Sequence, residues 1–158
     1  MKTLLITIFV LIVAVILLLS IFSRESKQGG AAGLVEGALS KCAKTPNCVC
    51  SEHSDDVDHY VEPIIIPRNV TVDALSLLRE AIEESGGHVE SEAKNYLAAT
   101  FTSSIFRFVD DVEIRLDSAQ QLIHIRSASR VGYSDMGVNR NRVGLLKRLF
   151  DEKIAEAN

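Results

Sequence analysis

RFVDDVEIRLDSAQQLIHIRSASR, residues 107–130, is the stretch that decides the fold of this chain. Apolar and polar residues alternate in both halves of the stretch, which is the pattern of half-buried β-strands. Ser118 and Ala119 between the halves predict a two-residue turn. The stretch therefore predicts an antiparallel hairpin of residues 107–116 and 122–130.

The two-residue turn sets the register of this hairpin and gives it two different faces. On the charged face Asp111 opposes Arg126 and Glu113 opposes His124, and each such pair contributes about 0.2–1 kcal/mol. The other face is mainly apolar, with Val112 opposite Ile125, Ile114 opposite Ile123, Phe108 opposite Ser129, and Asp110 opposite Ser127. A slip by one residue would mix the faces.

Three polar residues, Asp110, Ser127 and Ser129, fall on the face that we expect to be buried. A buried carboxylate is costly unless it is hydrogen-bonded or protonated. These residues are either the polar floor of a pocket between the sheet and the C-terminal helix, or structural groups. In the structural interpretation Asp110 accepts hydrogen bonds and the small serines allow close helix packing, as is usual for buried polar groups.

The segments around the hairpin predict an α+β domain. Residues 60–66 are rich in β-branched side chains but contain Pro63, which suits an edge strand. The other expected elements are a helix after Thr71 as N-cap, with Asp73 in its first turn, ended by residues 85–87; strands at 88–92 and 96–103; and a C-terminal helix starting near Asn139. The order β-α-β-β-β-β-α predicts a mainly antiparallel sheet with two helices packed on one face.

The N-terminal segment predicts a transmembrane helix. No residue from Thr3 to Phe22 is charged, and twenty helical residues match the ~30 Å apolar core of a bilayer. A cleaved signal peptide is the alternative, but its apolar region is usually shorter and ends in small residues. We therefore expect a single-pass anchor at residues 1–22, a flexible linker at 23–40 and one domain at 41–158.

The composition limits the partners of this domain. The chain carries a net charge of −4 and has no tryptophan, and it has no long basic run, so nucleic acid is not an expected partner. The basic residues flanking the anchor barely discriminate its orientation.

The three cysteines, in KCAKTPNCVCSEH (residues 41–53), allow three interpretations. Cys42 and Cys48 can close a disulfide around a turn, which implies an oxidising, non-cytoplasmic compartment such as the periplasm. The cysteines with His53 can instead bind zinc, although their spacing is not that of paired zinc ligands. Three reduced thiols follow if the domain faces the cytosol.

The segment after the hairpin is dense in hydrogen-bond donors and glycine. A helix N-terminus flanked by arginines suits a phosphate or carboxylate. The candidate ligand-binding residues are Arg126, Arg130, Tyr133, Asp135, Asn139 and Arg140. In the alternative interpretation the arginines at 130, 140 and 142 pair with carboxylates at 110, 111, 113 or 135 and fix the loop. Ser134 or Asp135 can cap a turn here, and Asn139 can cap the following helix.

Three motifs together resemble the bacterial and plastid family called domain of unknown function 1499. They are KCAKTPNCVCSE (41–52), FRFVDDVEIRLD (106–117) and IHIRSASRVGYSDMGVNRNRV (123–143). The family usually has Cys-Pro where this chain has Cys42-Ala43, and serine at Cys50, which weakens the zinc interpretation. The resemblance implies no catalytic residue, since the family's activity is not established, but members often have an N-terminal membrane or export segment.

Common enzyme motifs are absent from the sequence, and it predicts no cofactor and no metal. The leading hypothesis is a non-enzymatic, envelope-side module, anchored in the membrane, that binds a small anionic or lipid-derived ligand or a protein partner. One alternative is an enzyme acting on envelope lipid or glycan, with Asp110 or Asp135 as acid and base. Another is a scaffold in a membrane complex.

Overall fold

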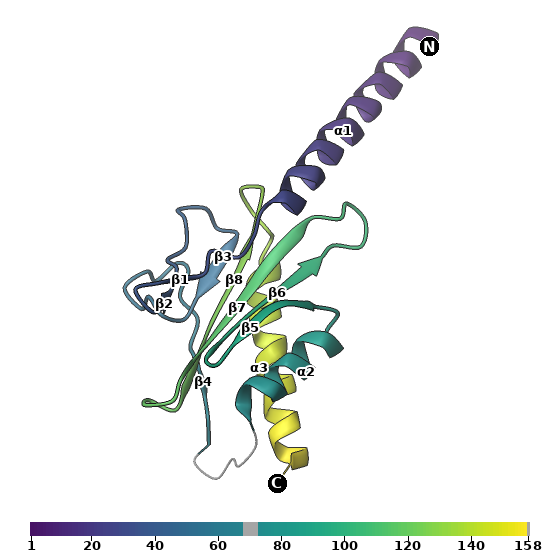
Figure 1. Ribbon diagram of the computed structural model, residues 1–158. Helices are drawn as coiled ribbons and strands as arrows, with labels where there is room; N and C mark the ends of the chain where they lie inside the picture. The colour runs from purple at the N-terminus through teal and green to yellow at the C-terminus, as the bar shows by residue number, and fades with distance from the viewer. Residues whose placement is uncertain (68–72, 158) are drawn as a thin grey trace.

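The computed structural model describes residues 1–67 and 73–157, and it confirms an α+β fold (Figure 1). The elements are α1 (Lys2–Gln28), β1 (Leu34–Val35), β2 (Ala38–Leu39), β3 (Cys48–Cys50), β4 (Ile64–Ile65), α2 (Ala74–Glu84), β5 (His88–Ala93), β6 (Tyr96–Thr102), β7 (Val109–Asp117), β8 (Leu122–Ser129) and α3 (Val138–Ala157). β1, β2 and β3 were not expected from the sequence.

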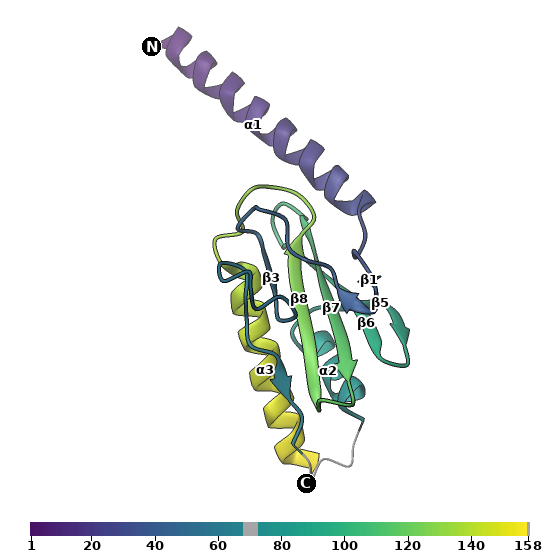
Figure 2. The same cartoon turned by 90° about the vertical axis from the view of Figure 1, so that its left-hand side faces the viewer.

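One antiparallel sheet carries the domain. Its strand order is β3-β8-β7-β6-β5. β4 pairs with the first two residues of β8, on the same edge of β8 as β3. α2 and α3 pack on one face of this sheet, as the sequence predicts (Figure 2). The core between sheet and helices is formed by fully buried side chains that include Leu78, Ile82, Ile114, Ile125, Leu146 and Phe150.

The opposite face of the sheet is covered by the segment that follows α1. Leu39 of β2 is buried, and the Gly33 amide donates to the Glu113 carboxylate at 2.7 Å. Glu113 and Asp111 are consequently buried although they point away from the helices. Where the sequence predicts a flexible linker over 23–40, the structure has the end of α1 and the short β1–β2 hairpin lying on β7.

The register of the β7–β8 hairpin differs from the predicted one by two residues. Glu113 lies opposite Arg126, not His124, and Asp111 lies opposite Ala128, not Arg126. On the helix-facing side the corrected pairs are Asp110 with Ser129, Val112 with Ser127, Ile114 with Ile125, and Leu116 with Ile123. Because side chains alternate with a period of two, this shift changes every partner but leaves each residue on its predicted face.

The turn explains the shift. Asp117 pairs with Leu122, so the loop has four residues, 118–121, in place of the expected two. The Asp117 carboxylate accepts a hydrogen bond from the Gln120 amide at 3.0 Å, and Gln121 adopts a left-handed φ of 57°. A side chain that bonds to the backbone in this way competes with the tighter turn.

An aspartate side chain stabilises the N-terminus of both α2 and α3. Asp73, expected within the first turn, is the N-cap of α2, and its carboxylate accepts from the Leu75 amide at 3.1 Å; Thr71, the predicted cap, lies outside the described residues. Asp135 accepts from the amides of Gly137 at 3.0 Å and Asn139 at 2.6 Å. Asn139 therefore does not cap α3, because it already lies inside the helix.

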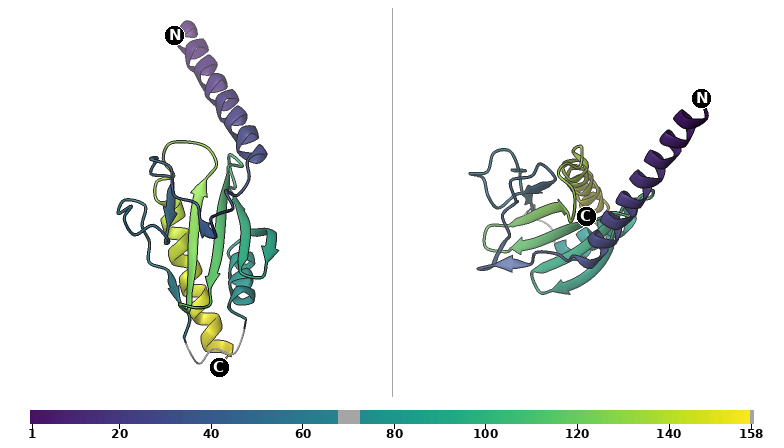
Figure 3. Two further views of the ribbon diagram at one scale, coloured as in Figure 1. Left: turned by 60° about the vertical axis from the view of Figure 1, so that its left-hand side comes forward. Right: turned by 90° about the horizontal axis from the view of Figure 1, so that it is seen from above.

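α1 is long and apolar enough to cross a membrane, a property that a signal sequence would share. It projects away from the sheet (Figure 3), but its last turn is fixed to the domain. The buried Ser26 hydroxyl accepts from the Val109 amide at 2.6 Å. The Ser26 carbonyl accepts from the Arg130 guanidinium at 3.2 Å. The junction between helix and sheet is thus a specific contact.

Candidate functional site

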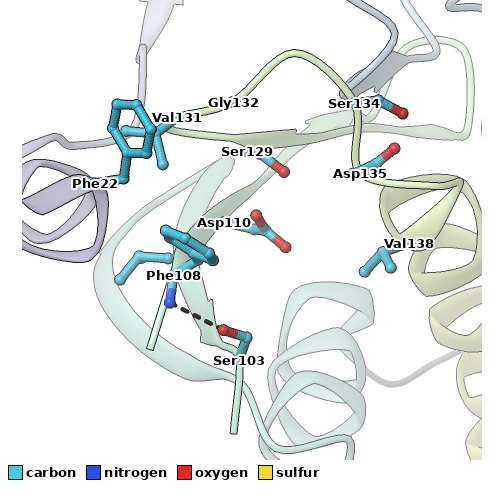
Figure 4. A pocket seen from close by; sticks show the side chains of 11 residues that line it. Phe22, Ser103, Phe108, Asp110, Ser129, Val131, Gly132, Ser134, Asp135 and Val138 are labelled. Atoms are coloured by element: carbon cyan, nitrogen blue, oxygen red, sulfur yellow. Dashed lines mark hydrogen bonds between the residues drawn. The ribbon is translucent and has the colours of Figure 1, made fainter. Parts of the chain in front are cut away.

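A pocket of about 240 Å³ lies where α1 meets the sheet (Figure 4). The end of α1, the start of β7, the end of β8 and the loop into α3 all contribute to it. Its lining includes apolar side chains, Phe22, Phe108, Val131 and Val138, and polar ones, Asp110, Ser129 and Asp135.

The pocket has an apolar side and a polar side. Phe22, Phe108 and Val131 gather on the side of α1, whereas Asp110 and Ser129 lie side by side in the middle (Figure 4). Asp135 lies on the opposite side, toward α3. The arrangement suits a ligand with an apolar part and a group that donates hydrogen bonds, since carboxylates and hydroxyls accept them.

Arg142 of α3 neutralises the central carboxylate of the pocket. Its guanidinium donates to Asp110 Oδ2 at 2.7 Å and also to the Ser127 hydroxyl at 3.1 Å. The same guanidinium lies 4.6 Å from the centre of the Phe101 ring, a favourable cation–π geometry. Arg142 is therefore a positioning group for Asp110, one of the arginine–carboxylate pairings that the alternative interpretation of the loop predicts.

Ser127 and Asn139 lie behind the pocket wall and are fully buried. The Ser127 hydroxyl donates to Asn139 Oδ1 at 2.6 Å. The side-chain amide of Asn139 donates to the Asn47 backbone carbonyl at 2.9 Å and to the Ser129 hydroxyl at 3.1 Å. Asn139 thereby connects α3 to β8 and to the residue before β3, so its contacts are structural ones.

Arg126 and Glu113 form an ion pair on the other face of the sheet, away from the pocket. Arg126 donates to Glu113 at 2.8 Å, and Tyr96 donates to the same carboxylate at 2.9 Å. Burial, and then the hydrogen bond to Glu113, raises the pKa of the Tyr96 hydroxyl. Arg126, Tyr96 and the Gly33 backbone amide thus all donate to the carboxylate of Glu113, which is fully buried.

Arg130 forms a second ion pair on this face. Its guanidinium donates to both oxygens of the Asp111 carboxylate, at 2.9 and 2.7 Å. A bidentate arginine–carboxylate pair is a strong charge-assisted interaction. Arg130 therefore joins β7, β8 and α1, and its charge is balanced by Asp111.

The six residues predicted to bind a ligand do not share one pocket, although Asp135 and Arg140 line a second, smaller pocket of about 100 Å³. Asp135 lines the pocket, Arg126, Arg130 and Asn139 are engaged inside the domain, and Tyr133 is exposed. Arg140 is also exposed, and it donates to the carbonyls of Tyr60 at 2.8 Å and Asp58 at 2.9 Å. The pairing of arginines with carboxylates, considered as the alternative, describes Arg130 and Arg142, which pair with Asp111 and Asp110.

Of the three polar residues expected on the buried face, Asp110 and Ser129 line the pocket and Ser127 lies behind it. Sequence reasoning missed the apolar lining. The alternation of residues 107–116 did place Phe108 and Asp110 on one face, which was the available signal. Phe22 has no such signal, because it belongs to the uncharged segment that predicts an anchor separate from the domain.

The structure contains a disulfide between Cys42 and Cys48, whereas Cys50 is a buried free thiol. Burial is the main cause that raises the pKa of Cys50. Among residues 1–67 and 73–157, no three His, Cys, Asp or Glu side chains are grouped to hold a metal ion. The disulfide occupies two of the three sulfurs that the zinc interpretation would need.

Comparison with known families matches residues 38–150 to the family described as "Protein of unknown function (DUF1499)". The chain belongs to this family. No curated protein and no solved structure matches it. The DUF1499 region runs from β2 into α3 and contains Asp110, Ser129 and Asp135 of the pocket, whereas Phe22 precedes it.

Proposed function

We propose that this DUF1499 protein is a non-enzymatic, membrane-anchored module that binds a lipid-derived ligand. The observation that carries the proposal is the position of the pocket: the end of the apolar segment of α1 supplies Phe22 to its wall. If α1 spans the bilayer, the pocket opens at the level where lipid chains meet headgroups.

The length of α1 supports its role as an anchor. The uncharged residues from Thr3 to Phe22, at 1.5 Å per residue, span the ~30 Å of a bilayer's apolar core. The Cys42–Cys48 disulfide supports a domain on the periplasmic or another non-cytoplasmic side, because disulfides persist in oxidising compartments.

The charges around the pocket favour a neutral or cationic head group over an anionic one. The nearby guanidinium of Arg142 is paired with Asp110, and that of Arg130 with Asp111. The polar lining consists of carboxylates and hydroxyls, so a hydroxyl or ammonium group on the ligand fits it best. The volume is below the ~300–1,000 Å³ of typical small-molecule sites, which suits one part of a lipid whose remainder stays in the bilayer.

Binding is better supported than acid–base catalysis. Asp135 uses both oxygens to cap α3, and Asp110 is held by Arg142. A general acid or base must exchange a proton with the substrate, whereas the donors that already bind these carboxylates, an arginine and two backbone amides, favour a role as hydrogen-bond acceptors. The pocket therefore resembles a receptor for a head group more than a reaction centre.

Native mass spectrometry of the full chain, extracted from its own membrane in mild detergent, tests the proposal. We expect a lipid species to remain bound to the wild type and to be lost from Val138→Trp, in which the indole fills the pocket. Val57→Trp is the matched control, because Val57 is 81% exposed and is not part of the pocket lining. An unliganded wild type, or equal lipid binding by both variants, would refute the proposal, and a chemically altered lipid would indicate an enzyme.

A further inference from the structure

The loop between β6 and β7 lies at the end of the sheet from which α1 leaves (Figure 1), and two of its large apolar side chains are exposed. Ile105 is 80% exposed and Phe106 is 48% exposed. Two further exposed side chains, Tyr133 and Met136, lie in the β8–α3 loop, at the same end of the molecule (Figure 2). Apolar side chains gathered on one end of a domain indicate an interaction surface.

The position of the β6–β7 loop along the length of α1 indicates that the partner of this surface is the lipid bilayer. Ile105 and Phe106 share a groove with Ile16 and Leu19 of α1. These two helix residues precede Phe22, the last residue of the uncharged segment, by six and three positions. At 1.5 Å per residue the loop therefore reaches about 4–9 Å into the apolar span, a depth typical of side chains buried at the headgroup–acyl boundary.

The loop cannot easily move away from this level. The Ser23 hydroxyl of α1 donates to the Arg107 carbonyl at 3.4 Å, and Ser26 accepts from the Val109 amide immediately beyond the loop. Basic side chains of Arg24, Lys27 and Arg107 line the same groove, and no acidic residue is among the described lining. Cations placed just outside an apolar surface suit the anionic headgroups of a bilayer.

We propose that the β6–β7 loop, residues 103–108, inserts Ile105 and Phe106 into the bilayer beside α1, as a second membrane contact of the domain. The inference rests on the anchoring role of α1 in the proposed function and does not depend on what the pocket binds, although Phe108 of the loop lines that pocket. It makes the domain lie against the lipid surface in one orientation.

The absence of tryptophan from the chain allows a direct test with three single-tryptophan variants of the full protein. Ile105→Trp reports on the loop and Ile12→Trp on the middle of α1. Ile65→Trp is the matched control, because Ile65 is 72% exposed on β4 and distant from α1 (Figure 1). Each variant is reconstituted into nanodiscs of phosphatidylcholine and phosphatidylglycerol, with bromine atoms at defined positions along the acyl chains.

We expect Ile105→Trp to emit at shorter wavelength than Ile65→Trp and to lose emission mainly to bromines near the headgroups. Bromines near the chain ends should quench Ile12→Trp most strongly, and bromines at neither position should quench Ile65→Trp. If bromines quench Ile12→Trp but not Ile105→Trp, the inference about the loop is overturned and the anchor stands. A blue-shifted but unquenched Ile105→Trp also overturns the inference, because a protein partner and not lipid would then cover the loop. Unquenched Ile12→Trp overturns the anchor as well. Phe106→Trp serves as a second reporter if Ile105→Trp does not fold.

Discussion

Replacing Arg130 with alanine should destabilise the domain severely. Asp111 is only 5% exposed, and Arg130 donates to both of its oxygens. The substitution leaves this carboxylate buried without a cation, and breaking a buried ion pair from one side costs about 3–5 kcal/mol. It also frees the Ser26 carbonyl at the end of α1. Such a loss is a large fraction of the ~5–15 kcal/mol that stabilises a typical domain.

Thermal unfolding of the full chain in micelles, followed by circular dichroism, measures this loss. We expect the Tm of Arg130→Ala to fall by roughly 10–20 °C. Arg140→Ala is the matched control, because Arg140 is exposed and donates to backbone carbonyls, and its loss should cost about 1 kcal/mol or less.

A double-mutant cycle separates the ion pair from other effects of the truncation. Asp111→Ala combined with Arg130→Ala should cost less than the sum of the two single changes, since no unpaired charge remains. Equal, small decreases of Tm for Arg130→Ala and Arg140→Ala would refute the reasoning. So would loss of lipid binding by Arg130→Ala at an unchanged Tm, which would make Arg130 a ligand-binding residue.

Three further predictions follow from local geometry. The hydrogen bond to Asp56 raises the pKa of His59 in the folded protein. Protonated His59 therefore stabilises the fold fully below its unfolded pKa of about 6.5, and this contribution is lost as the pH rises through the folded pKa. In urea unfolding, His59→Gln should lose more stability at about pH 5 than at about pH 9. Gly87→Ala places a Cβ 2.6 Å from Ile82 and 2.7 Å from Phe101 and should cost about 1–3 kcal/mol, whereas Gly144→Ala meets open space and should gain up to about 1 kcal/mol in the same unfolding assay. Alkylation of denatured, unreduced protein should label one thiol, and mass spectrometry showing three labelled thiols would contradict the disulfide.

The hairpin of residues 107–130 shows which features of a β-hairpin the alternation of apolar and polar residues can predict. Alternation assigns faces, and the faces of Asp110, Val112 and Ile114 were predicted correctly. It does not distinguish registers that differ by two residues, because both keep the same faces. Turn chemistry had to decide between them, and the hydrogen bond from the Gln120 amide to the Asp117 side chain favours the longer loop.

Nothing in the sequence indicates that the charged face of the β7–β8 hairpin is buried. Asp111 and Glu113 alternate with apolar residues, the pattern of a solvent-facing side. Their burial depends on residues 29–40, whose glycine-rich composition predicts a linker, and whose contact with β7 is made through backbone groups such as the Gly33 amide. Backbone contacts leave no periodic pattern. The sequence therefore left open whether an arginine such as Arg130 pairs with a buried carboxylate or binds a ligand.

The junction at Ser26 and Arg130 relates the two proposals to one structural cause. A flexible leash would let the domain tumble above the membrane, and neither the pocket nor the β6–β7 loop would have a fixed height. In the structure Ser26 bonds to both β7 and Arg130, and a Cβ at Gly29 would lie 3.0 Å from Arg130 Cδ. The chain therefore leaves α1 through a close contact that a larger residue at position 29 would disturb. Because that contact fixes the helix to the sheet, a bilayer placed around α1 as proposed would set the depth of the pocket and of Ile105 together with that of Phe22.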